Sequence, residues 1–343
     1  MSAQRAAPKT RRRHARRTVG ARTLNRVRQV VSQLARLRAS DGPDAGTLDL
    51  GAGQRLDVSN LDKVFFPKPG YTKGDLLAYY ATVSPFLVPA IADRPLVLKR
   101  FPHGLSGESF YQQRAPEDPP SCVRVEPVVD DGLKTQLRLI GGDLATLLYV
   151  VQLGAISIDP WHSRVPWVGS ADYAIVDLDP GPRASFRRVV DVACWVREEL
   201  DRLGLHGVPK TSGASGIHVV LPLVPGTSNE TARLLAELVA TRVAERHPRE
   251  ATVTRWVQSR PASAVYVDFL QNIRGKTVAS VYSVRATPDA TVSTPLRWDE
   301  LTTDLDPRQF TLRTVAHRLR EVGDLWSEGM RQLNDPRRLL GDQ

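Results

Sequence analysis

Cysteines and long apolar runs are both scarce in this 343-residue chain, and their scarcity excludes several classes of protein. Cys122 and Cys194 are the only cysteines and form no CxxC pair, which excludes a cysteine zinc cage and a disulfide framework. No run approaches the roughly 18 consecutive apolar residues of a membrane span, and the basic N-terminus lacks the apolar stretch of a signal peptide. We therefore expect a cytoplasmic protein without a membrane partner.

Acidic residues are missing before Asp41, and this absence decides where the net charge lies. Residues 1–38 contain twelve lysines and arginines, whereas the whole chain has a formal charge of +10, so residues 39–343 carry a net −2. A basic segment favours a polyanionic partner, because neutralised phosphates release condensed counterions. The alternative is a solvated arm without a specific partner.

Apolar spacing predicts a basic arm followed by a mixed α/β body. We expect a helical arm and linker over residues 1–53, a folded body over 54–325 and a C-terminal tail over 326–343. The apolar period favours helices, and runs rich in Val, Ile and Tyr favour strands. The expected helices are 22–38, 73–88, 185–203, 229–246 and 310–321, and the expected strands are 174–178, 217–223, 265–269 and 277–282. This pattern is typical of an α/β or α+β fold.

Three aspartates interrupt two of the expected strands. Asp177 and Asp179 are two positions apart in Tyr173-Ala-Ile-Val-Asp-Leu-Asp-Pro, so they point to the same face. Buried carboxylates repel unless a cation lies between them, and oxygen ligands suit Mg²⁺ or Mn²⁺. Asp268 interrupts Val265-Tyr-Val-Asp-Phe-Leu in the same way. Three carboxylates can hold two ions about 4 Å apart, which is the arrangement for nucleotidyl transfer.

Each aspartate also has a plainer interpretation. Asp179 precedes Pro180 and Gly181, so the Asp-Leu-Asp-Pro segment alone is typical of a strand end that enters a turn. Asp268 alone is consistent with a buried, hydrogen-bonded acid. The three acids together favour the metal site.

Polar residues near these strands are candidates for phosphate and base binding. The loop that starts at Lys210-Thr-Ser-Gly-Ala-Ser-Gly offers backbone amides, the hydroxyls of Ser212 and Ser215, and His218 to an anion. The alternative for His218 is a structural histidine. Further candidates are the polar residues that follow Asp268, namely Gln271, Asn272, Arg274 and Lys276. The chain has only eight lysines, and Lys63 and Lys73 are candidates for the same reason as Lys276, because a scarce lysine is expected where a compact charge is useful.

Phe110 and Tyr111 are adjacent aromatic residues with polar neighbours. Such rings can stack on nucleic-acid bases. Because adjacent strand residues face opposite ways, we expect only one ring to be exposed. Ordinary core aromatics remain the alternative.

The motifs together resemble a known family. Asp177-Leu-Asp-Pro-Gly, Thr211-Ser-Gly-Ala-Ser-Gly-Ile-His and Val267-Asp-Phe-Leu-Gln-Asn are similar, in this order, to the three motifs of archaeo-eukaryotic primase-type polymerases. The resemblance is greatest to the polymerase domain of the bacterial end-joining ligase LigD and its stand-alone relatives. It implies a primase-polymerase catalytic domain over residues 54–325, and the N-terminal basic helix lies outside it.

The resemblance implies roles for individual residues. Asp177, Asp179 and Asp268 match the ligands of two Mn²⁺ or Mg²⁺ ions. The residues that match those around the nucleoside triphosphate are Ser212, His218, Gln271, Lys276 and Arg285. Lys63 and Lys73 match lysines that bind the 5′-phosphate beyond a gap or break, and Phe110 and Tyr111 match aromatics near the templating base.

Two positions depart from the family pattern. Ser215 stands where the family loop has a lysine, which removes one positive charge near the nucleotide. Asp159 stands where relatives have a histidine that contacts the nucleotide, and His162 is the candidate replacement. Neither departure affects the three aspartates.

The function that follows is a DNA-dependent nucleotidyltransferase that fills gaps or extends DNA ends in repair, with a preference for ribonucleotides. Implied partners are gapped or broken DNA, nucleoside triphosphates, an ATP-dependent DNA ligase and an end-binding protein, and the implied location is the bacterial nucleoid. No Lys-x-Asp-Gly ligase motif occurs, so we expect a free-standing member. The competing hypotheses are a template-independent terminal transferase and a binding protein whose catalytic site has lapsed.

Overall fold

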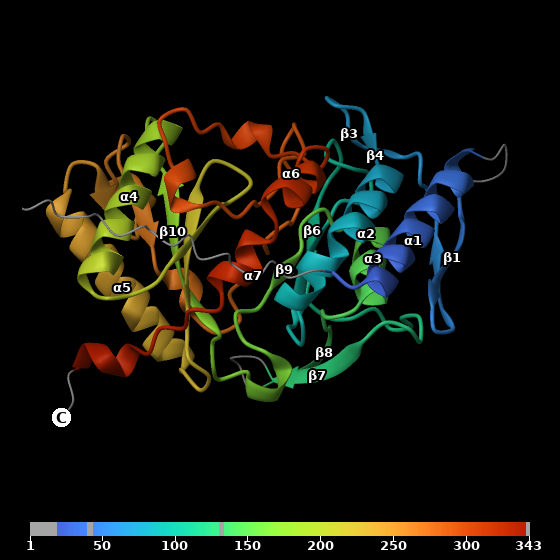
Figure 1. Cartoon of the computed structure of the whole chain (residues 1–343), viewed down its shortest axis with the longest axis horizontal. Helices are drawn as coiled ribbons and strands as arrows, with labels where there is room; N and C mark the ends of the chain where they lie inside the picture. The colour runs from blue at the N-terminus through green and yellow to red at the C-terminus, as the bar shows by residue number, and fades with distance from the viewer. Residues whose placement is uncertain (1–18, 40–43, 130–133, 341–343) are drawn as a thin grey trace, which may run out of the picture.

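A central β-sheet and a helical layer beside it make up the computed structural model, which describes residues 19–39, 44–129 and 134–340. The two parts lie along the long axis of the molecule, with α4 and α5 at one end and α1 at the other (Figure 1). The mixed α/β class expected from the sequence is confirmed.

The main sheet has five strands in the order β11-β12-β10-β14-β13. All neighbours are antiparallel except the parallel pair β13 and β14. The strands in spatial order are β11 (Val208–Thr211), β12 (Ile217–Pro222), β10 (Tyr173–Pro180), β14 (Val265–Asp268) and β13 (Ala251–Thr252). β10 is buried on both faces over most of its length, which explains its nearly continuous apolar sequence.

Two helices pack against this sheet, α4 (Phe186–Arg202) and α5 (Asn229–Arg246). Ser185 and Ser228 cap their N-termini, because each hydroxyl accepts a hydrogen bond from a backbone N–H of the first turn. Glu199 is fully buried and pairs with arginines of both helices.

The second part is built around α2 (Lys73–Ala90), which lies between α1 (Ala21–Ala39) and α3 (Leu144–Gln152). Val30 and Leu34 of α1 are buried, so the expected basic helix is present and packs onto the body. The short strands here are β1 (Gly46–Gly51), β2 (Gln54–Val58), β3 (Val64–Phe66), β4 (Tyr71–Thr72), β5 (Leu96–Arg100), β6 (Phe110–Gln112), β7 (Val125–Val129), β8 (Thr135–Leu139) and β9 (Asp159–Pro160).

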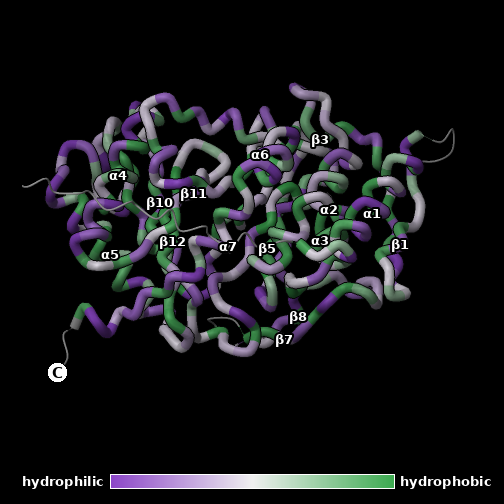
Figure 2. Tube along the Cα trace, in the orientation of Figure 1, coloured by the Kyte–Doolittle hydropathy of each residue, from purple (hydrophilic) through white to green (hydrophobic). Residues whose placement is uncertain are grey.

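The apolar core runs through both parts (Figure 2). The hydroxyl of Tyr79 donates to Tyr282 O and that of Tyr80 donates to Ile156 O, which ties α2 to distant segments. The remaining helices are α6 (Val315–Val322), α7 (Leu325–Gly329) and the 3-10 turns η1 (Val165–Trp167), η2 (Val257–Ser259), η3 (Leu270–Asn272), η4 (Trp298–Glu300), η5 (Pro307–Gln309) and η6 (Pro336–Leu340). Among the described helices, none has the length and apolarity to cross a membrane.

Three local expectations differ from the structure. Residues 277–282 form no strand, because Tyr282 has a φ of +62° and its neighbours bond to other segments. The last expected helix begins only at Val315, since Thr311 forms a bridge with Thr291. Gly46–Gly51 lies in the expected linker but forms β1, which pairs with β2.

Candidate metal and nucleotide site

Three aspartates meet at the end of β10 and β14. Asp177 and Asp268 are directly opposite each other in the sheet, and Asp179 follows Asp177 on the same face. One oxygen of each carboxylate lies within 4.8 Å of one oxygen of both others. The convergence that the sequence predicted is therefore present. Asp177 and Asp268 are buried, whereas the side chain of Asp179 is exposed.

The position of Asp268 is fixed by its own hydrogen bonds. Its Oδ1 accepts from Leu270 N (2.7 Å) and Tyr266 Oη (3.2 Å), and its Oδ2 accepts from Gln271 Nε2 (2.9 Å). Asn272 then joins η3 to β10, because its amide exchanges two hydrogen bonds with the backbone of Ile175. Gln271 thus lies beside a carboxylate, and Asn272 has a structural role that its position in the sequence does not reveal.

The carboxylates raise one another's energy when they are ionised. Burial raises the pKa of Asp177 to about 6, against the opposing effect of Lys210 and Arg285. Although Asp179 is exposed at its surface, desolvation by the surrounding protein and the charges of Asp177 and Asp268 raise its pKa to about 7. A cation at this point would relieve both the desolvation and the repulsion.

The donor set fits a hard divalent cation. All three side chains offer oxygen, which Mg²⁺ and Mn²⁺ prefer. Asp177 Oδ1 is buried and has no hydrogen-bond partner among the described residues, although His218 Nε2 lies 3.2 Å away. An unsatisfied buried carboxylate oxygen is costly. The site is therefore incomplete without a further positive group.

The glycine-bearing loop between β11 and β12 closes on itself. Ser212 Oγ accepts hydrogen bonds from Ala214 N (3.1 Å) and Gly216 N (3.0 Å), so these two amides are not free for an anion. The serine hydroxyl keeps its own hydrogen to donate. At Gly216 an added Cβ would lie 2.4 Å from Leu178 O, so only glycine permits this loop to approach β10.

The other nucleotide-site candidates lie at different depths. Arg285 is half-buried and donates to Ser212 O (2.7 Å), which links it to the loop. Lys276 is exposed just beyond η3. His218 is buried directly opposite Asp177 on the neighbouring strand. The structure brings Ser212, His218 and Arg285 together and leaves Lys276 at the surface.

Lys63 and Lys73 form a second cluster at the start of α2. Lys73 is buried and its Nζ donates to Ser59 O (2.9 Å), while Lys63 Nζ lies 3.4 Å from His103 Nδ1. Burial, with a further contribution from the nearby Lys63, lowers the pKa of Lys73 to about 8. An anion between the two lysines would stabilise the charged form of Lys73.

Phe110 and Tyr111 are both exposed, at 47% and 69%, so the expectation of one exposed ring is wrong. They lie on β6, a short strand that pairs only with β5 among the described strands. Arg100 lies under the Phe110 ring and Lys99 under the Tyr111 ring. Exposed rings beside cations suit bases attached to phosphates.

Comparison with known proteins assigns this arrangement to a family. The family model described as the LigD primase-polymerase domain matches residues 72–326. The chain belongs to this family. The primase-polymerase domain therefore includes all three aspartates, the Ser212 loop and Lys73, whereas α1 precedes the matched residues.

Several curated relatives and solved structures are similar to the domain. LigD of Mycolicibacterium smegmatis is 31% identical over 274 residues, which cover 79% of this chain and 36% of that protein. LigD of Bacillus subtilis is 32% identical over 270 residues, which cover 78% and 43%. The chain thus spans less than half the length of either relative. Both relatives are named as non-homologous end-joining proteins.

One similar solved structure is the polymerase domain of Mycobacterium tuberculosis ligase D in complex with DNA. Its TM-score is 0.76 at 31% identity, and the match covers 82% of this chain and all of that one. The family resemblance stated from the motifs is thereby confirmed. The fold of this chain is that of a LigD polymerase domain.

Two residues of the primase-polymerase domain differ from what the sequence suggested. His162 is buried against Tyr173, with ring centroids 5.0 Å apart, so it presents no exposed imidazole in place of the missing histidine. Lys210, which the sequence shows only as the start of the loop, is buried beside His218. The scarcity of lysine was the only signal that could have found it.

Proposed function

We propose that this chain is a DNA-dependent nucleotidyltransferase that fills short gaps or extends DNA ends in repair. The observation that carries the proposal is the convergence of Asp177, Asp179 and Asp268 in a domain of the primase-polymerase family. The catalytic body that we assign to this activity spans residues 54–325. We also propose that it prefers ribonucleotides and acts together with a DNA ligase.

The residues of the site divide the work by their chemistry. Two Mn²⁺ or Mg²⁺ ions, when bound by the three aspartates, supply activation of a primer 3′-hydroxyl and neutralisation of the triphosphate. Ser212 can donate its hydroxyl to a phosphate oxygen, and His218 can donate a ring N–H. Arg285 and Lys276 add positive charge on the approach to the loop. Gln271 keeps Asp268 in place.

A second set of residues is suited to DNA. Lys63 and Lys73 can hold the terminal phosphate of the strand beyond the gap, because two cations converge there. Phe110 and Tyr111 offer two exposed ring faces to the template. Arg100 joins the two groups, since it lies under Phe110 and its charge also affects Lys73.

Nucleotide choice on a gapped duplex tests the proposal. The templating base opposite a one-nucleotide gap is varied through all four bases, and each ribo- and deoxyribonucleotide is offered with Mn²⁺. We expect the complementary nucleotide to be added, and the ribonucleotide faster than the deoxyribonucleotide. Addition that ignores the templating base would instead support a terminal transferase.

Divalent cations should stabilise the folded protein. Because the ion binds the folded state and not the unfolded chain, it should add about 2.7 kcal/mol at a hundred times its Kd. Asp179→Asn should be more stable than wild type without metal, since one of three repelling charges is gone, and should respond less to Mn²⁺. Thermal melting with EDTA or Mn²⁺ measures both effects. An equal response of the two proteins would contradict the assignment.

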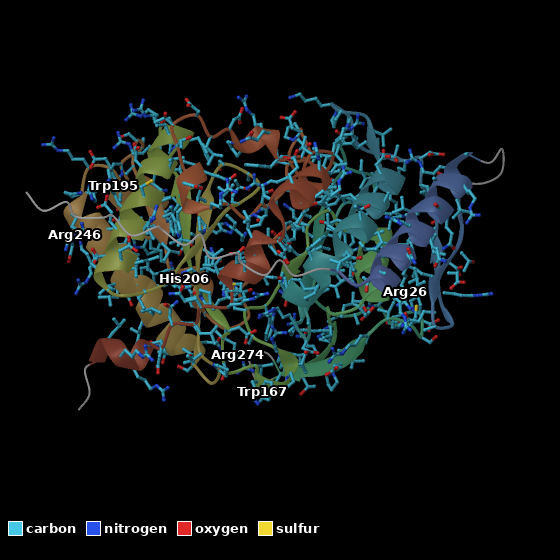
Figure 3. All side chains as sticks on the ribbon, in the orientation of Figure 1. Arg26, Trp167, Trp195, His206, Arg246 and Arg274 are labelled. Atoms are coloured by element: carbon cyan, nitrogen blue, oxygen red, sulfur yellow. The ribbon has the colours of Figure 1, made fainter. Side chains whose placement is uncertain are left out.

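The arginines of α1 should contribute electrostatic affinity for DNA. Arg28 and Arg36 are exposed on this helix, as is Arg26, which Figure 3 marks at the opposite end of the molecule from α5. The end of α1 lies beside the lysine cluster, because Arg38 pairs with Asp75 (2.7 Å) in the first turn of α2. Duplex DNA held at the lysines can therefore reach α1.

Binding of gapped duplex at several salt concentrations tests this contribution. Arg28→Gln combined with Arg36→Gln should lower the slope of log affinity against log salt by up to about 2, since each phosphate contact contributes about 0.9. The control replaces two exposed arginines outside α1, Arg187 and Arg249, with glutamine. Equal slopes for both double variants would show that α1 does not contact the DNA.

A further inference from the structure

Four polar residues form a continuous row across four strands of the main sheet. Lys210 is directly opposite His218, His218 is opposite Asp177, and Asp177 is opposite Asp268. Directly opposite residues project from the same face. All four side chains are buried, so the contacts within the row decide their protonation and orientation.

The hydrogen bonds of Lys210 determine how it meets His218. Its Nζ lies 3.0 Å from Ala279 O, 2.6 Å from Ser293 Oγ and 2.8 Å from His218 Nδ1. The carbonyl only accepts, and Ser293 Oγ already donates its hydrogen to Thr211 O (2.8 Å), so both take an N–H from the lysine. When Lys210 is protonated, the third N–H of its ammonium group is left for His218 Nδ1. Burial lowers the pKa of Lys210 to about 7, so this donor is fully present only below pH 7.

The other side of the imidazole leads to the same tautomer. His218 Nε2 lies 3.2 Å from Asp177 Oδ1, and a carboxylate oxygen can only accept. An N–H at Nε2 is therefore attracted by this oxygen, whereas a lone pair would be repelled. With Nδ1 accepting from Lys210, the proton of the neutral imidazole lies on Nε2.

We propose that Lys210 is a positioning residue that holds His218 in the tautomer with its proton on Nε2. The imidazole then presents its single N–H donor at the carboxylate site, either to Asp177 Oδ1 or to an anionic oxygen of the substrate that takes its place. Lys210 itself touches no substrate and acts through His218. The link to a triphosphate rests on the proposed function, but the tautomer does not.

Nitrogen NMR of ring-labelled histidine tests the tautomer directly. In wild type, His218 should show a protonated Nε2 and an unprotonated Nδ1, with the signal assigned by its loss in His218→Gln. In Lys210→Met, Nδ1 loses its donor and the ring should shift toward the other tautomer or become charged. A wild-type ring protonated at Nδ1 would overturn the proposal, whatever the activity of the protein.

Steady-state kinetics test whether Lys210 acts through His218. Lys210→Met and His218→Gln should each raise the nucleotide KM by roughly tenfold to a hundredfold, the size expected for one hydrogen bond to a charged group, with a smaller effect on kcat. The double variant should be no worse than His218→Gln. If the two increases in KM multiplied in the double variant, the proposal would be contradicted.

Glu199→Gln provides the control for loss of folding. Glu199 is buried between α4 and α5 and belongs to no part of the row, so its substitution should lower Tm without changing the His218 tautomer or the nucleotide KM. If it changed the tautomer as Lys210→Met does, general destabilisation would explain the result. If wild-type protein shows the predicted His218 tautomer but extends no primer, the role of Lys210 is supported and the proposed polymerase activity is refuted.

Discussion

Asp177→Asn should abolish measurable nucleotide addition while the protein still binds gapped DNA. The substitution keeps the shape of the side chain and removes the central charge of the triad, since Asp177 lies beside both Asp179 and Asp268. Metal ions supply several kcal/mol of transition-state stabilisation, so we expect a loss of at least roughly 10³-fold, or about 4 kcal/mol. Single-turnover extension of a labelled primer measures the rate.

A matched aspartate separates the triad from general charge effects. Asp201 is exposed on α4, with 71% of its side chain accessible, and Asp201→Asn should extend primers at the wild-type rate. Fluorescence anisotropy with gapped duplex should give similar affinities for all three proteins. An Asp177→Asn variant with more than a tenth of the wild-type rate would exclude Asp177 as a ligand of an essential metal ion.

Replacing Lys63 and Lys73 with glutamine should erase the preference for a 5′-phosphorylated downstream strand. Each lysine can donate a charge-assisted hydrogen bond worth about 1.5–3 kcal/mol, so one such bond alone should give wild type a preference of roughly tenfold to a hundredfold. The measurement is the ratio of affinities for gapped duplexes with a 5′-phosphate and a 5′-hydroxyl. Lys68→Gln is the control, because this lysine is exposed and pairs with Asp289.

The same preference should depend on pH with a predictable sign. The pKa of Lys73 is lowered to about 8, so in the unliganded protein its charge is present at pH 7 and is lost as the pH rises above 8. The affinity ratio should therefore fall between pH 7 and pH 9 in wild type. A ratio that persists in the double variant, or that rises with pH, would show that these lysines do not hold the phosphate.

The sequence predicted the parts of the site that follow from local geometry. Alternation along a strand is a property of any extended backbone, so Asp177 and Asp179 were expected on one face and are found there. The pairing of Asp177 with Asp268 depends on the register between two strands about 90 residues apart. The similar apolar setting of the two strand acids suggested that they converge, and the order of the motifs in a known family supported it, but neither gave the register.

The sequence failed where tertiary contacts decide the outcome. The position of Lys210 in a loop-like segment gave no sign that its partners are Ala279 and Ser293. Both Phe110 and Tyr111 are exposed because β6 is a short edge strand, so the alternation that buries one face elsewhere has no effect there. The valines and tyrosine of residues 277–282 favoured a strand, but Tyr282 has a left-handed backbone conformation that a strand does not permit.

Extension of a primer across a one-nucleotide gap by wild-type protein, with and without a divalent cation, tests the central claim most directly. The substrate carries a 5′-phosphate on the downstream strand, and the product is resolved by length. We predict a primer one nucleotide longer that forms only with Mn²⁺ or Mg²⁺ and only with the nucleotide complementary to the template. No extension with any nucleotide or cation, by protein that still binds the gapped duplex, would contradict the claim and favour a binding protein with a lapsed site.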